Sequence, residues 1–376
     1  MLFFGVMAVL PVTVSANELK LTPSVAVQEE YNDNVFFSST DKRSDFVTTL
    51  TPALDFSARG ERGEGGLSGG INWRHYARVG SDIVDYFSQG RFDYKVVPRL
   101  DVSGLAGVTR DSRPDRIDAA TGIALNTGSL RQSYHAGGNY LLSEKNTVSL
   151  SYGFDREDFD LEEVPSTRVH SASAGLSHLL APETSLEENF AYSRQLTDVS
   201  QVDDYALMLG VKKKFRQLWS LALDVGGRYT HASFQGGGNA TNDDAGWVGN
   251  LSFIYTGEKV NGNVTFNHDV SVAAGRTGSL ERTGGSVTIG KRFTEKLSGT
   301  LFLGYYYNKS NQNQFSLQPI DERTLDLNCV SRYEFTRDLA LEASYHYVNV
   351  SYREFGTDAD QSIAMLRFIW RHPLLL

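Results

Sequence analysis

Few residues of this chain combine the types and the spacing that chemistry at a fixed site requires. The pair His170-Ser171 is the nearest candidate for acyl transfer, but consecutive residues of an extended strand point to opposite faces. Asn242-Asp243-Asp244 lacks the ordered ligand spacing of a calcium loop, and Gly236-Gly237-Gly238 lacks the context of a phosphate-binding loop. The sequence therefore predicts no enzyme, no metal and no cofactor.

Charged side chains and histidines do recur at alternate positions of short segments that are apolar on their other side. Because side chains alternate across a strand, we expect these residues to share one water-filled face. The set comprises Arg74, Arg91, Asp93, Lys95, Arg131, His135, Asp224, Arg228, Asp326, Arg332, Glu342 and His346. Facing rows of opposite charge could set an electric field across a lumen, or the mixed charges could simply keep a wide pore hydrated.

The elements that carry these residues have a period of two. Apolar and polar residues alternate in residues 46–56, 219–231, 247–255 and 260–270. A helix would scatter the same residues around its surface, so the period indicates strands. Segments of about ten residues suit transmembrane β-strands, and no run of about 18 apolar residues follows the N-terminus to indicate a membrane helix.

The same alternation assigns individual side chains to faces. Leu223 and Phe253 are predicted to face lipid, whereas Arg228 and Asn250 are predicted to face the lumen. The single cysteine, Cys329, shares the apolar parity, so we interpret it as a small apolar residue of the lipid face and not as a reactive thiol.

The connections between these segments are alternately short and long. Eight short ones have hairpin chemistry: residues 59–66 and the turns that end at Leu100, Asn146, Thr184, Trp219, Val260, Leu297 and Leu339. Nine longer, polar ones span residues 32–44, 78–83, 111–129, 156–166, 195–203, 232–244, 271–280, 308–322 and 352–360. This pattern predicts an all-β, antiparallel, up-and-down transmembrane barrel of 16–18 strands, most simply 18, with both termini in the periplasm. The longest loop, 111–129, is the one expected to narrow the pore.

The two ends of the chain have patterns of their own. Residues 1–16 are similar to a secretory signal peptide with Val14-Ser15-Ala16 as its cleavage site, although no basic residue precedes Lys20, so its start is interpreted as truncated. Residues 17–376 then form one barrel domain. The segment 362–370 is similar to the C-terminal signal that the barrel assembly machinery reads, but it is followed by Arg371-His372-Pro373 and three leucines.

Export and a barrel together predict the outer membrane of a Gram-negative bacterium, with outer-membrane lipids and the barrel assembly machinery as partners. The net charge of −9 without a basic stripe argues against nucleic acid as a partner.

A short motif near the start adds a family resemblance. Residues 30–36 read EYNDNVF and are followed by Asp45, a strand and Pro52. This stretch resembles the opening of the beta-barrel porin 2 family, whose members are outer-membrane barrels associated with exopolysaccharide biosynthesis and export. The motif residues are Tyr31, Asn32, Asp33, Asn34, Val35 and Phe36. Asn32, Asp33 and Asn34 are expected to form a side-chain-to-backbone turn at the extracellular rim, anchored by Tyr31 with Phe36, in a structural role or in gating and substrate contact.

Together, the barrel and the resemblance imply a passive, hydrated outer-membrane channel for export of a secreted polysaccharide, with a periplasmic polysaccharide-export protein as partner. The alternatives are a general small-solute diffusion porin and a surface scaffold or adhesin. A barrel of 16–18 strands encloses an aqueous channel, so strand number favours transport over a scaffold.

Overall fold

The computed structural model describes residues 16–117, 124–125, 127–235, 240–273 and 275–375. Eighteen long strands dominate it: β1 (Ala16–Asn32), β2 (Asp45–Gly60), β3 (Gly63–Tyr76), β4 (Ser81–Val97), β5 (Leu100–Asp111), β8 (Ser129–Ser143), β9 (Asn146–Phe159), β10 (Thr167–Ala181), β11 (Thr184–Leu196), β12 (Ser200–Phe215), β13 (Trp219–Phe234), β14 (Thr241–Thr256), β15 (Val260–Val272), β16 (Ser279–Arg292), β17 (Leu297–Ser310), β18 (Ile320–Glu334), β19 (Leu339–Tyr352) and β20 (Thr357–Arg371). Three pieces of two residues are added: β6 (Arg116–Ile117), β7 (Ala124–Leu125) and β21 (Leu374–Leu375). Residues 1–15 of the predicted signal peptide and the glycines 236–238 lie outside the described residues.

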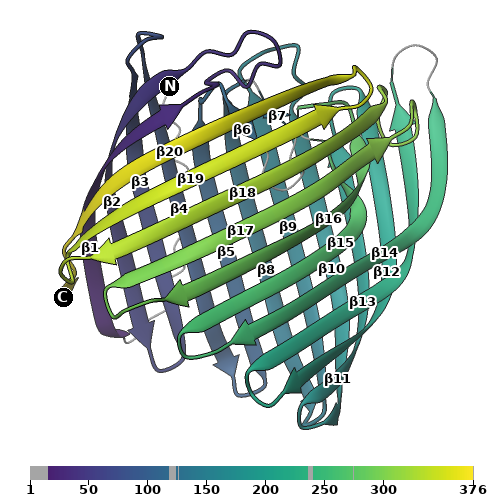
Figure 1. Ribbon diagram of the computed structural model, residues 1–376. Coiled ribbons are helices and arrows are strands. Elements are labelled where there is room, and N and C mark those ends of the chain that lie inside the picture. Colours follow the sequence, from purple (N-terminus) through teal and green to yellow (C-terminus); the bar gives the residue numbers. More distant parts are fainter. Residues whose placement is uncertain (1–15, 118–123, 126, 236–239, 274, 376) are drawn as a thin grey trace.

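The strands form one closed antiparallel barrel, as predicted. Each long strand pairs with its neighbours in the sequence, and β1 pairs with β20 from Asn32 opposite Ile363 to Ser24 opposite Arg371. Figure 1 shows these strands strongly tilted and wrapped into a single wall. Among the described residues, no helix is long and apolar enough to cross a membrane.

The eight short turns lie at one end of the barrel and the nine other connections at the opposite end, as predicted, because successive strands run in opposite directions. Three connections predicted to be long are short in the structure: residues 77–80, 197–199 and 353–356. The strands there extend into the residues predicted as loops 78–83, 195–203 and 352–360. In the turn between β12 and β13, Arg216 (φ 49°) and Gln217 (φ 60°) are both left-handed, which is the backbone of a tight hairpin turn. Both ends of the described barrel lie at the short-turn end, since Ala16 pairs with Gly60 and the Arg371 amide donates to the Asp338 carbonyl.

The outer face of the wall is hydrophobic. Leu223 is 43% exposed and Leu207 is 61% exposed, as expected for side chains that meet lipid instead of protein. Phe253 has the same parity, and Cys329, half-buried, lies opposite Leu301 and Tyr345 on this face. Among the described residues, the barrel has no central apolar core. Buried apolar residues of the described chain instead form four small clusters, and all four lie at the long-loop end.

Candidate channel and the loops that close it

The polar face of the wall is the inner one. Only inside a barrel can side chains from strands that are not neighbours meet, and such contacts all involve the polar face or the long loops. Asn32 on β1, for example, donates from Nδ2 to Asp115 Oδ2 at 2.8 Å, although Asp115 belongs to the connection between β5 and β8. The lumen is therefore lined by the residues opposite the hydrophobic face.

The connection between β5 and β8, which contains β6 and β7, enters the lumen. Its start is fixed by the Ser112 amide, which donates to Asp85 Oδ1 at 2.9 Å. Its Asp115 accepts from Asn32 and, at 3.0 Å, from Gln361 Nε2 on β20. This connection is part of the 111–129 segment expected to narrow the pore, and it reaches across the ends of β1 to β4 to the barrel seam.

A cation lies near the start of this connection, Arg113, whose side chain is 43% exposed. Burial alone would lower the pKa of Arg113, but the hydrogen bond to Asp111 and the charges of Asp111, Asp115 and Glu30 raise it above its ordinary value. Arg113 donates from Nη2 to Asp111 Oδ2 at 2.8 Å. The guanidinium therefore stays charged, and its ion pair with Asp111 stiffens the start of the connection.

The EYNDNVF segment lies beside that loop, at the seam between β1 and β20. The Asn34 amide donates to Asn32 Oδ1 at 2.9 Å, which is the expected side-chain-to-backbone turn. Asn34 Nδ2 donates to the carbonyls of Ser38 and Asp360, and the Ser362 amide donates to Asp33 Oδ1 at 2.7 Å. The segment thus ties the first loop to the last strand.

The expected anchor differs from the observed one. Tyr31 is 40% exposed on the lipid face and contacts the ring of Phe46, at 5.1 Å between centroids, and not Phe36. Phe36 packs against the buried cluster of Val35, Val47 and Tyr76 inside the barrel. The parity of the strand explains the difference, because β1 ends at Asn32 and the chain turns inward before Phe36.

The wall itself bends inward at the long-loop end of β15 and β16. The ladder between β14 and β15 stops at Gly249 opposite His268, whereas β13 and β14 remain paired up to Ser233 and Thr241. β15 and β16 remain paired to the end of their hairpin, Val272 opposite Ser279. The tip of the β15–β16 hairpin has therefore left the wall. Ser279, the first residue of β16, donates to Gln195 on β11, although β12 to β15 lie between these two strands in the barrel order.

Arg228 on β13 binds this displaced tip. Its side chain is 1% exposed and donates to Asp244 Oδ2 at 2.8 Å and to Glu281 Oε2 at 2.7 Å. The ring of Phe315, from the connection between β17 and β18, lies 5.1 Å from the guanidinium. A charge this deeply buried needs both carboxylates as partners. The predicted lumen residue Arg228 thus joins the wall, the hairpin tip and the β17–β18 connection in one packed cluster.

The connection between β17 and β18 completes the closure. Its Leu317 packs against Val202, Ala232 and Phe234 on the inner face of β12 and β13. Ser316 forms a bridge with Gly278 at the hairpin tip, where a φ of +110° and the adjacent Phe315 carbonyl leave no room for a side chain. The prediction of residues 308–322 as one of nine long, polar connections did not include this role. The apolar residues Phe315 and Leu317 in an otherwise polar stretch were the available signal.

On the other side of the long-loop end, β9 contacts the same β15–β16 hairpin and the start of β18. Phe159, the last residue of β9, packs against the buried Ala273, Leu280 and Ile320. Strands and loops from several sides of the barrel thus converge at the long-loop end, and their packed side chains narrow the lumen there. The short-turn half has no comparable apolar cluster among the described residues.

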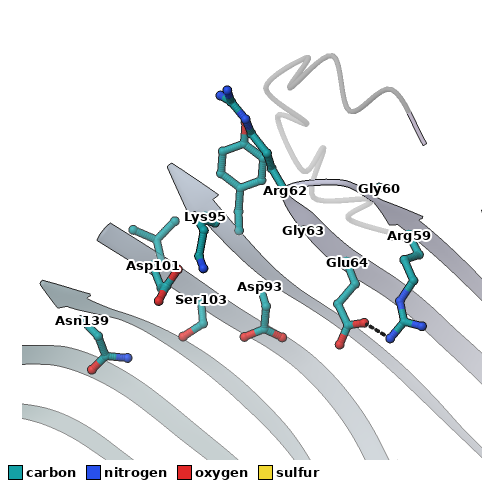
Figure 2. A pocket seen from close by; sticks show the side chains of 12 residues that line it. Arg59, Gly60, Arg62, Gly63, Glu64, Asp93, Lys95, Asp101, Ser103 and Asn139 are labelled. Atoms are coloured by element: carbon teal, nitrogen blue, oxygen red, sulfur yellow. Dashed lines mark hydrogen bonds and ion pairs between the residues drawn. The ribbon is translucent and has the colours of Figure 1, made fainter. Parts of the chain in front are cut away.

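The short-turn half instead contains a charged cavity of about 450 Å³ beside β2 to β8. Figure 2 shows Glu64, Asp93 and Ser103 on one side of the strands, with Arg59 joined to Glu64 by an ion pair of 3.0 Å. Lys95 lies opposite Asp101 in the ladder between β4 and β5. We call this region the charged wall. It includes two predicted lumen residues, Asp93 and Lys95.

Across the lumen lies a patch without charge. It comprises Asn250 and Ser252 on β14, Asn261, Asn263, Thr265 and Asn267 on β15, Ser286 and Thr288 on β16, and Ser298, Thr300 and Phe302 on β17. The ladders show that these residues share the inner face, since Asp224 is opposite Asn250, which is opposite Asn267. We call this patch the neutral wall.

The other predicted lumen residues share the inner parity and are mostly paired with a neighbouring strand. Arg74 binds Asp85, Arg131 binds Glu157, His135 lies 3.3 Å from Asp155, Arg332 binds Glu342 at 2.7 Å, and His346 lies 2.9 Å from Asp326. Arg91 and Asp224 have the same parity. Local pairing fits the hydration interpretation better than facing rows of opposite charge, because paired charges cancel at short range.

His170 and Ser171 point to opposite faces, as expected. His170 lies on the lipid face, where its Nδ1 is 2.8 Å from the Tyr152 hydroxyl. In the described part of the chain, no group of three His, Cys, Asp or Glu residues could hold a metal ion.

A closed barrel of 18 strands with a hydrophobic exterior and a polar interior defines a transmembrane β-barrel protein. Its chain is similar to OccAB4 of Acinetobacter baumannii, with 12% identity, a TM-score of 0.49 and coverage of 95% of this chain and 99% of that one. It is also similar to OpdK of Pseudomonas aeruginosa, solved with vanillate, with 11% identity, a TM-score of 0.49 and coverage of 95% and 99%. The ferric citrate transporter FecA in its unliganded form has 12% identity, a TM-score of 0.52 and coverage of 90% of this chain and 60% of that one, which shows a shared barrel fold.

No family model matches the chain, and no curated protein matches it. The resemblance to the beta-barrel porin 2 family therefore rests on residues 30–36, Asp45 and Pro52.

Proposed function

We propose that this protein is a passive channel for small hydrophilic solutes in the outer membrane of a Gram-negative bacterium, with the short turns in the periplasm. The observation that carries the proposal is the division of the lumen. The short-turn half is polar and holds cavities of about 450 and 420 Å³ on opposite walls, while the inserted loops pack against the wall in the long-loop half. A barrel of 18 strands is too wide to be filled by its own side chains.

The mechanism is based on the cost of moving polar groups through hydrocarbon. The transfer of a hydroxyl or amide from water to an apolar phase without hydrogen bonds costs roughly 2–7 kcal/mol per group. The inner face supplies water and hydrogen-bonding side chains, which lowers that cost. Solutes would then pass down their own gradient, at a rate limited by the narrowed long-loop end.

The second candidate is export of an exopolysaccharide, favoured by the resemblance of residues 30–36. This function needs the mouth to open to a polymer and a periplasmic polysaccharide-export protein to deliver it. The packed clusters around Arg228 and Phe159 make small-solute passage the better supported of the two in this conformation.

Two measurements test these functions. Purified protein in planar bilayers should conduct ions in discrete steps, and a deletion strain should take up small hydrophilic solutes more slowly while its surface polymer stays normal. A strain that synthesises polymer but retains it inside would select export. A barrel that stays electrically silent, with both phenotypes normal, would select a surface scaffold.

A further inference from the structure

The charged wall and the neutral wall face each other across the lumen. β4 and β15 lie nine strands apart in either direction around the 18-strand barrel, and they stand at the centres of the two walls. The charged wall offers carboxylates and cations. The neutral wall offers side-chain amides and hydroxyls on four consecutive strands. A solute in the lumen therefore meets two chemically different surfaces.

The neutral wall carries a cavity of about 420 Å³ at its short-turn end. Asn261, Thr288 and Thr300 line it, and no other described residue forms a hydrogen bond with the polar groups of these three side chains. Gly290 makes room for the Asn261 side chain, because a Cβ at this position would overlap the side-chain oxygen of Asn261. The volume falls in the usual range of small-ligand sites, roughly 300–1,000 Å³.

Four charged residues line the rim of this cavity at the short turns: Glu258, Lys259, Lys291 and Arg292. Arg292 donates from Nη2 to the Glu258 carbonyl at 3.1 Å, and the Lys291 ammonium lies 5.3 Å from the centre of the Phe293 ring. Farther from this rim, the amides and hydroxyls of the neutral wall carry no charge, so an anionic solute would lose hydration against them without gaining a counter-charge. An uncharged solute has no such penalty.

Amides and hydroxyls donate and accept at once, which matches the paired hydroxyls of a sugar. Phe302 lies opposite Thr288 in the ladder between β16 and β17 and adds an aromatic ring to the patch. An aromatic ring can pack against the C–H face of a sugar. We infer that the neutral wall is a binding subsite for an uncharged oligosaccharide, centred on Asn261, Thr288 and Thr300. This inference rests on the proposed channel function, since the solute must enter the lumen to reach the wall.

The test uses maltohexaose, a linear neutral glucose oligomer, added at the short-turn side of single channels in planar bilayers and, separately, to detergent-solubilised protein in a calorimeter. The wild-type current should show blocking events whose duration reports residence on the wall. The double variant Asn261→Leu with Thr288→Val should shorten the residence time, and weaken binding, by about tenfold or more. The matched control, Ser151→Ala with Ser173→Ala, removes two inner hydroxyls from β9 and β10 and should leave both unchanged.

The outcomes separate the two proposals. Ion conductance without sugar binding overturns the subsite and leaves the channel standing. Sugar binding that is lost in the double variant, in a barrel that never conducts, supports the subsite and overturns the channel. If maltohexaose binding weakens equally in the control pair, hydroxyls anywhere on the inner face contribute to it. This result would also overturn the assignment of the subsite to the neutral wall.

Discussion

Arg228 Nη2 on β13 and Glu281 Oε2 on β16 lie 2.7 Å apart, although β14 and β15 stand between their strands in the barrel order. This contact exists because the tip of the β15–β16 hairpin folds into the lumen. The pair therefore acts as a latch that holds the tip against the inner wall.

Breaking the latch should open the mouth. Glu281→Gln removes the charge that meets Arg228 while Asp244 still compensates the guanidinium. A hydrogen bond to a charged group contributes about 1.5–3 kcal/mol, so the tip should leave its site more often and single-channel conductance should rise. Asp243→Asn, next to Asp244 but exposed on the outer face, is the control and should leave conductance unchanged. A lower stability with the wild-type conductance would speak against a latch.

Loosening the β5–β8 connection should have a similar effect at the other side of the mouth. Asp115→Ala removes the acceptor shared by Asn32 and Gln361, and replacement of residues 113–127 by a short Gly-Ser linker removes the connection altogether. Conductance in planar bilayers should rise in both variants, and more in the second. If neither variant differs from wild type, this connection does not limit passage.

The two faces of the wall should respond differently to the same charge. Leu223→Arg places a guanidinium in lipid and should cost about 2–4 kcal/mol near the midplane, whereas Asn250→Arg places it in the lumen and should be tolerated. Urea unfolding of the barrel refolded in lipid vesicles measures both. Equal destabilisation would contradict the assignment of faces.

The seam between the first and last strands should depend on Asn34. This side chain is fully buried and exchanges hydrogen bonds with Ser38 and Asp360. Asn34→Ala leaves two carbonyls and one amide without these partners, so we expect a loss of about 2–4 kcal/mol of unfolding free energy. Hydrogen exchange should accelerate first in β1 and β20. Asn250→Ala, an exposed asparagine on β14, serves as the comparison and should change little.

Most of the wall could be predicted from sequence, because its determinants are local. A period of two fixes which face a side chain occupies, and turn chemistry fixes where a strand ends, so Arg74 and Leu223 could be placed without any knowledge of their neighbours. The turn at Asn32 and Asn34 is equally local. The anchoring role expected of Phe36 was wrong because its position depends on where the chain turns after β1.

The closure of the mouth could not be predicted in the same way. Ser279 meets Gln195, and Leu317 meets Val202, only because a hairpin leaves its ladder and a distant loop packs beside it. Nothing in residues 271–280 distinguishes a loop in solvent from one that folds inward. The charged wall and the neutral wall could not be predicted strand by strand either, because their positions on opposite sides of the lumen are set only when the barrel closes.

The pairing of β1 with β20 has a consequence for how the molecule reaches this form. Every other ladder between long strands joins strands that are neighbours in the chain and can zip up as a hairpin, but Asn32 and Ile363 stand at opposite ends of the sequence. Their encounter requires nearly the whole polypeptide to be ordered first, and contacts of such long sequence separation form slowly. The EYNDNVF turn, with its bonds to Asp360 and Ser362, sits at this last junction, so its residues are placed to capture the final strand when the sheet becomes a cylinder.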